Sequence, residues 1–191
     1  MKKNLFFATI LLFGFAACNN PKTYEGVVIN DVRWATRNVC APSTFAQNPE
    51  DAGMFFQWNR RKGWNNVGED TPTDWDSAPA EGTAWYAAND PCPEGWRVPT
   101  REELMSLNSA EGVWTTQNGV NGRLFGTYPH QIFLPAVGRR HIDGTLYFVE
   151  REGFYWSTGT STASRLRFRA DYNGIRDLSP AYGFSVRCVA K

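Results

Sequence analysis

A turn and a helix start, encoded together in residues 90–107, constrain the fold of this 191-residue chain more than any other feature. Pro91 and Pro93 fix the backbone φ angle on both sides of Cys92. Gly95 then supplies a position at which a left-handed turn costs little. Cys92 is therefore expected in a rigid turn.

A short helix is predicted directly after this turn, from Arg101 to about Asn108. Thr100 and Glu103 have the spacing of a capping box, in which each side chain accepts the backbone N–H of the other residue. Leu104 lies on the apolar face of this helix, which we expect to pack against the core.

A second helix is predicted from Pro49 to about Arg60. Asn48 has the side chain of an N-cap, and Pro49 suits the first helical position. Phe55 and Phe56 fall on one side of this stretch and would face the core.

Most of the remaining chain is typical of antiparallel strands joined by tight turns. Asn30-Asp31 separates two short apolar runs near the start of the domain. Later runs are separated by Asn-Gly or Asp-Gly pairs at 118–119, 121–122, 143–144 and 173–174. Two early helices followed by strands predict the α+β fold class, in a single loop-rich domain.

The composition indicates one compact domain with no nucleic-acid partner. Hydrophobic residues make up 42% of the chain, which is enough for one sizeable core. The 20 Lys and Arg residues nearly balance the 19 Asp and Glu residues. A nucleic-acid-binding surface needs an excess of basic residues, so that class of partner is not expected.

Residues 1–17 are predicted to be an export signal. Two lysines precede an apolar run that is shorter than the roughly 20 residues of a membrane-spanning helix. The sequence Phe15-Ala-Ala-Cys18 resembles the lipobox of bacterial lipoproteins, which implies that Cys18 carries a lipid such as palmitate. Plain cleavage and an uncleaved anchor are the alternatives. Residues 18–25 would tether the domain, residues 26–191, to a membrane.

Several motifs together resemble the Fibrobacter succinogenes major paralogous domain family. The clearest is Pro-Cys-Pro-Glu-Gly-Trp-Arg-Val-Pro-Thr at 91–100. The others lie at 32–39, 48–59, 114–123, 133–136, 155–157 and 182–188. The resemblance implies a C-type-lectin-like α+β fold on envelope proteins, with no established catalytic activity and with the first and last strands paired.

Three cysteines remain once Cys18 is assigned to the anchor, so at least one of them must stay single or pair elsewhere. We favour a disulfide between Cys92 and Cys188, which would close a long loop and stabilise the fold by up to about 4–5 kcal/mol. Cys40 stands where the resembling family usually has glycine, and we expect it to be a buried free thiol.

Three tryptophans are the candidate ligand-binding residues. Trp64, Trp75 and Trp85 lie in an irregular stretch, 61–89, that shows neither helical nor strand periodicity. Exposed tryptophans of this kind could stack on sugar rings or anchor a protein partner. For each single tryptophan, a role in pinning the loop to the core is the competing interpretation.

A metal site in the same loop is a weaker hypothesis. Asp70, Asp74 and Asp76, together with Glu69, offer oxygen ligands for calcium, although their spacing fits no EF-hand and a solvated acidic loop is favoured. The two histidines lack a cysteine cluster at zinc-ligand spacing. No metal or other cofactor is therefore assigned.

The sequence does not predict an enzyme, because no framework places a nucleophile beside a base. Formylglycine-generating enzymes have a related lectin-like fold, but their chemistry depends on cysteines near the C-terminal end, where this chain has only Cys188. We expect a lipoprotein anchored in the outer membrane that recognises a glycan or protein ligand in the periplasm or outside the cell. A structural or assembly role in a surface complex is the alternative.

Overall fold

The computed structural model describes Cys18 and residues 26–68, 70–78, 82, 84–159 and 163–191. The predicted export signal, 1–17, and the tether residues 19–25 lie outside the described residues. In the part that is described, no helix is long and apolar enough to cross a membrane.

The described chain is built mainly from β-strands, with one α-helix and one 3-10 turn, so the predicted α+β, lectin-like fold class with two helices is wrong. The strands of the first half are β1 (Gly26–Ile29), β2 (Val32–Ala35), β3 (Val39–Ala41), β4 (Thr44–Phe45), β5 (Phe55–Gln57), β6 (Gly63–Trp64) and β7 (Trp96–Arg97). The helical elements are η1 (Ala87–Asn89) and α1 (Arg101–Ser109). The later strands are β8 (Gly112–Gln117), β9 (Val120–Thr127), β10 (His130–Pro135), β11 (Arg139–Arg140), β12 (Leu146–Tyr147), β13 (Gly153–Ser157), β14 (Ser164–Arg169), β15 (Tyr172–Asp177), β16 (Gly183–Phe184) and β17 (Val189–Ala190).

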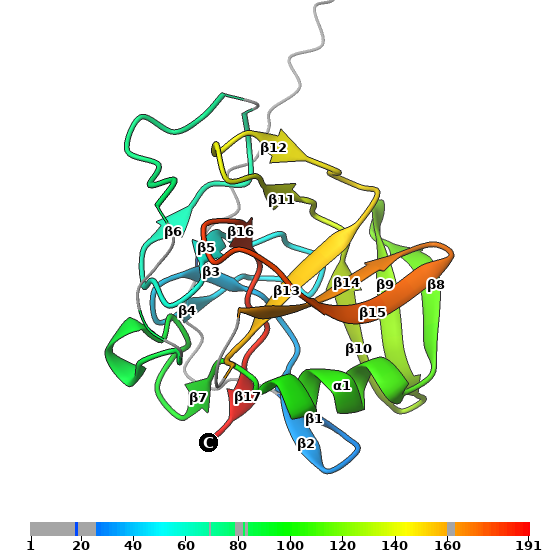
Figure 1. Cartoon of the computed structure of the whole chain (residues 1–191). Coiled ribbons are helices and arrows are strands. Elements are labelled where there is room, and N and C mark those ends of the chain that lie inside the picture. The colour runs from blue at the N-terminus through cyan, green and yellow to red at the C-terminus, as the bar shows by residue number, and fades with distance from the viewer. Residues whose placement is uncertain (1–17, 19–25, 69, 79–81, 83, 160–162) are drawn as a thin grey trace, which may run out of the picture.

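These strands form several small sheets. The largest has the order β12-β11-β16-β5-β6, and the others are β1-β2-β17-β7, β10-β9-β8, β13-β14-β15 and β3-β4. In Figure 1, β13, β14 and β15 cross the centre of the molecule, and α1 lies below them, where it packs against β14 and β15. Strand β17 pairs with β2 through Val189 and Trp34, so the last strand lies in the same sheet as the first but pairs with the second strand, not with β1 as the family resemblance implies.

Helix α1 confirms the predicted helix at 101–108. The Glu103 amide donates to Thr100 Oγ1 at 3.1 Å, and the Thr100 amide donates to Glu103 Oε2 at 2.7 Å, which completes the capping box. Leu104 and Leu107 are fully buried. Local capping and one apolar stripe were therefore sufficient to predict this element.

The second predicted helix, 49–60, is wrong. Gly53 interrupts it with a φ of +68°, and a Cβ there would lie 2.3 Å from the Val39 carbonyl oxygen. The chain then enters β5, whose three residues are all buried between β16 and β6. A strand covered on both faces has no polar alternation, so its apolar run was mistaken for a helix face.

The turn signals were reliable only in part. Three pairs form turns between neighbouring strands, as predicted. Asn30-Asp31 connects β1 to β2, Asn118-Gly119 connects β8 to β9, and Asp143-Gly144 lies between β11 and β12. The pairs at 121–122 and 173–174 instead lie inside β9 and β15. Gly122 is needed there because a Cβ would lie 2.4 Å from the Phe133 ring on the paired strand. Glycine can thus mark a close approach of strands as well as a turn.

The central sheet separates two hydrophobic clusters. Phe154 and Trp156 of β13 face one cluster, while Tyr155 between them faces the other together with Leu166 and Phe168 of β14. All five residues of β13 are consequently buried. This arrangement fixes the orientation of the other side chains of β14, which include Arg165 and Arg167.

Candidate functional site

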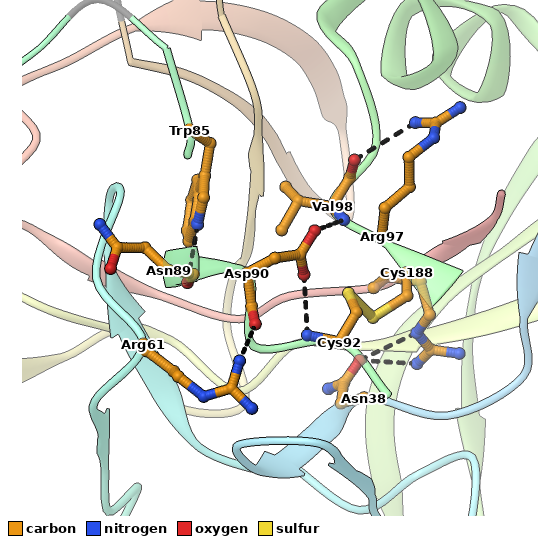
Figure 2. The surroundings of a disulfide bond; sticks show 10 residues. Asn38, Arg61, Trp85, Asn89, Asp90, Cys92, Arg97, Val98 and Cys188 are labelled. Atoms are coloured by element: carbon orange, nitrogen blue, oxygen red, sulfur yellow. Dashed lines mark hydrogen bonds between the residues drawn. A yellow bond between two sulfur atoms is a disulfide. The ribbon is translucent and has the colours of Figure 1, made fainter. Parts of the chain in front are cut away.

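Two disulfides organise the molecule. One joins Cys92 to Cys188, the pair favoured from the sequence, and its surroundings are shown in Figure 2. The other joins Cys18 to Cys40, so the expectation of a free Cys40 thiol is wrong. The reason is that Cys18 approaches Cys40 in space, which sequence spacing could not reveal. A lipid on Cys18 would occupy the same sulfur atom, so lipidation and the Cys18–Cys40 disulfide exclude each other within one molecule.

Two of the three candidate tryptophans pin the irregular loop. Trp64 is only 6% exposed and packs against Trp75 with 5.1 Å between ring centroids. The Trp75 indole nitrogen donates to the Ile142 carbonyl oxygen at 2.9 Å, and its ring lies against Gly144 and Gly183. These contacts hold the loop on the sheet that contains β11 and β16.

Trp85 is placed differently, because its half-buried ring lines a pocket. Its indole nitrogen donates to the Asn89 carbonyl oxygen at 2.9 Å, and its ring meets Trp58 edge-on at 6.0 Å between centroids. These two contacts fix the orientation of the ring. The pocket has a volume of about 310 Å³ and is lined by Trp85, Ala87, Asp90, Arg97, Val98, Thr100, Thr158 and Lys191.

Asp90 forms one wall of this pocket. Its Oδ1 accepts the Cys92 amide at 2.8 Å and its Oδ2 accepts the Val98 amide at 3.0 Å, as Figure 2 shows. Burial raises the pKa of Asp90 above its usual value, and the two amide hydrogen bonds offset this only in part. Each oxygen retains capacity for a further hydrogen bond, so a ligand hydroxyl could still donate to this carboxylate.

Arg97 lies beside Asp90 and is tied to the capping box. Its Nη1 and Nη2 donate to the two carboxylate oxygens of Glu103 at 2.8 and 2.6 Å. The hydrogen bond with Glu103 raises the pKa of Arg97. Burial alone would raise the pKa of Glu103, but the hydrogen bonds from Arg97 and Thr100 outweigh it and the pKa is lowered.

Thr158 is brought to the pocket by a long-range contact. Its backbone amide donates to the Pro99 carbonyl oxygen at 2.8 Å, and an isolated parallel bridge connects it with Thr100. No sequence signal pointed to Thr158, since only the tertiary structure joins the end of β13 to the start of α1. Asp90 could have been found, because a carboxylate before a Pro-Cys-Pro turn is well placed to accept nearby amides.

The acidic loop residues do not converge on one point. Asp74 forms a salt bridge with Lys62, and Asp76 Oδ2 lies 2.6 Å from Arg60 Nη2. The Asp70 carbonyl oxygen accepts a hydrogen bond from Arg140. Among the residues that the structure describes, no group of three or more His, Cys, Asp or Glu side chains could hold a metal ion.

Comparisons with protein-family models, with curated proteins and with solved structures found no match to this chain. The pocket combines an aromatic ring with a carboxylate, a guanidinium, a lysine and two threonines, which offer one apolar surface and several hydrogen-bonding groups.

Proposed function

We propose that this chain is a non-catalytic recognition protein of the bacterial cell envelope whose Trp85 pocket binds a carbohydrate. The observation that supports this most is the Trp85 ring on the wall of a pocket that also contains Asp90 and Thr158. Sugar rings present C–H faces to aromatic rings and hydroxyls to carboxylates and other hydroxyls, so this set of side chains matches both kinds of surface.

The proposed binding mode assigns one role to each group. The Trp85 ring contacts an apolar sugar face, Asp90 accepts a ligand hydroxyl, and Thr158 exchanges a hydrogen bond with a second hydroxyl. The indole nitrogen of Trp85 is already engaged by Asn89, so the ring face is the part that remains for the ligand.

The envelope part of the proposal comes from the sequence. The export signal supports secretion. The sequence Phe15-Ala-Ala-Cys18 supports a lipid anchor in the outer membrane, which requires molecules in which Cys18 is not bonded to Cys40. The Cys92–Cys188 disulfide is consistent with an oxidising compartment.

A glycan array followed by titration of the best-binding oligosaccharide tests the proposal. Trp85→Ala is expected to weaken binding at least about tenfold, which corresponds to about 1.4 kcal/mol. Thr158→Val keeps the shape of the side chain and should weaken binding about threefold to tenfold through loss of one hydrogen bond. Tyr86→Ala, at an exposed neighbour outside the pocket, is the control and should bind as the wild type does.

Two results would contradict carbohydrate recognition. One is an array with no binding to any glycan, and the other is binding that Trp85→Ala leaves unchanged. Concentration-dependent oligomers without glycan affinity, measured by sedimentation velocity, would instead support the assembly role.

A further inference from the structure

Three arginines surround one phenylalanine ring in a cluster that shares no residue with the Trp85 pocket. The guanidinium carbons of Arg139, Arg165 and Arg167 lie 5.0, 5.6 and 5.9 Å from the centroid of the Phe154 ring. Arg165 and Arg167 are two residues apart on β14 and so extend from the same face, while Arg139 comes from β11. Arg139, Arg165 and Arg167 are called the arginine cluster below.

Only one arginine of the cluster forms a salt bridge among the described residues. Arg167 Nε and Nη2 donate to Glu152 Oε2 and Oε1 at 2.7 and 2.8 Å. Within the described part of the chain, the guanidinium groups of Arg139 and Arg165 form neither a salt bridge nor a hydrogen bond, and Arg139 Nε, Arg165 Nε and Arg165 Nη1 are enclosed without an acceptor. Glu152 also attracts Arg139 and Arg165 electrostatically, but one carboxylate against three guanidinium groups leaves a net positive charge on the cluster.

Burying this net positive charge costs folding free energy. Arg165 is only 6% exposed, and its pKa is lowered to about 10, first by burial and then by repulsion from Arg139 and Arg167. The aromatic rings around the cluster attract cations but bring no negative charge. Buried guanidinium groups in proteins normally meet carboxylates, carbonyls or phosphates, so unbalanced ones call for an explanation.

The cluster is also open on one side. Arg139 and Arg167 are half-buried, as are Tyr172 and Tyr182 beside them, whereas Arg165 is buried. The Arg139 guanidinium carbon lies 4.8 Å from the centroid of the Tyr182 ring. The cluster thus combines one buried arginine with two partly exposed ones, and its aromatic neighbours hold the arginines in place before a ligand arrives.

We propose that the arginine cluster binds an oxyanion, either the carboxylate or the phosphate or sulfate group of a ligand. A planar guanidinium can give two parallel hydrogen bonds to such a group, and three neighbouring guanidiniums with one carboxylate among them favour an anion over any neutral ligand. The proposal does not depend on carbohydrate binding at Trp85.

The proposal is tested by titrating the protein with sodium glucuronate, sodium phosphate and sodium sulfate. Sodium chloride keeps the ionic strength constant. At least one of these anions should bind saturably and raise the melting temperature. Arg139→Gln and Arg165→Gln should each weaken that binding at least tenfold. Arg33→Gln removes the same charge from an exposed position on β2, in a different sheet from β11 and β14, and should change the affinity less than twofold.

The choice of anions separates the two ligand sources. Stronger binding of glucuronate identifies a carboxylate ligand, and stronger binding of phosphate or sulfate identifies a tetrahedral oxyanion. A melting temperature that rises without saturation, and equally in all four proteins, is an unspecific salt effect and would overturn the proposal. Equal affinity in the wild type and both cluster variants would overturn it as well.

Discussion

Arg187 and Arg165 are both enclosed in the protein interior, but only Arg187 finds acceptors there. Arg187 Nε and Nη2 donate to Asn38 Oδ1 at 3.0 and 2.8 Å, and its other bonds reach the carbonyl oxygens of Ala35 and Phe133. Arg165 has no such partner among the described residues. A buried arginine can thus be an internal cross-link of the backbone in one region and an unused donor in another.

Arg140 belongs with Arg187. It is 1% exposed and donates to Asn65, Val67, Gly68, Asp70 and Gly144, chiefly to their backbone carbonyl oxygens. A loop without regular structure has carbonyl groups that no strand satisfies, and one guanidinium can satisfy several of them. Arg140 and Arg187 therefore act as internal cross-links, whereas the Arg165 guanidinium has no acceptor among the described residues.

The largest effect is expected for Arg187→Met. The substitution removes all bonds to Asn38, Ala35 and Phe133 and leaves three acceptors buried, so the free energy of unfolding should fall by about 3–5 kcal/mol. Urea unfolding at pH 7 measures it. Arg169→Met, at an exposed arginine paired with Asp171, should cost less than about 1 kcal/mol. Equal losses in the two variants would remove the basis of the comparison.

Arg140→Met is expected to cost about 2–4 kcal/mol, because the acceptors it abandons lie nearer to the surface and water can replace part of the interaction. Limited proteolysis should also detect faster cleavage between residues 65 and 76. Arg176→Met is the matched control. Unchanged cleavage in Arg140→Met would show that the tryptophans, and not this arginine, hold the loop.

Tyr155→Phe should cost about 1–2 kcal/mol at pH 7, because Tyr155 donates to the Pro135 carbonyl oxygen at 2.9 Å. Burial raises the pKa of Tyr155 to about 12 despite the charge of Arg187. A tyrosine with a raised folded pKa stabilises fully below its unfolded pKa of about 10, and that contribution is lost as the pH rises from about 10 to about 12. The difference in stability between wild type and Tyr155→Phe should therefore shrink over this interval. A constant difference would contradict the assignment.

The smallest effect, and one of opposite sign, is expected for Arg165→Met. Without bound anion the substitution removes an unbalanced charge and keeps most of the side-chain volume, so the free energy of unfolding should rise by about 1 kcal/mol. Thermal unfolding in chloride buffer measures it. A loss of stability would mean that contacts with Phe154 and Phe184 outweigh the cost of the charge, and Arg165 would then join the structural arginines.

The sequence predicted those elements whose signals are local. The capping box of Thr100 and Glu103 needs only residues of its own turn, and α1 begins where predicted. The Asn-Gly pair at 118–119 likewise forms its hairpin. The failures concern features that depend on distant partners. Gly53 and β5 are shaped by Val39, β6 and β16, which no local pattern announces.

The candidate site, like the fold, could be predicted from the sequence only in part. Trp85 was singled out together with Trp64 and Trp75, but only folding decided that Trp85 alone of the three lines the described pocket, while the other two pack on each other. In the sequence, the alternation of Arg165 and Arg167 with Leu166 and Phe168 indicates only one polar face of a strand. Their gathering around Phe154 requires β11 and β13, which lie elsewhere in the chain.

The sequence by itself determined the rigid turn at Cys92, the helix that follows it and the hairpins with local turn chemistry, because steric limits and capping act between near neighbours. Only the tertiary structure decided the β-rich architecture, the pairing of Cys18 with Cys40 and the contrast between Arg187 and Arg165. Each of these depends on which groups from distant segments share a low-dielectric interior, and that is set when the sheets pack together.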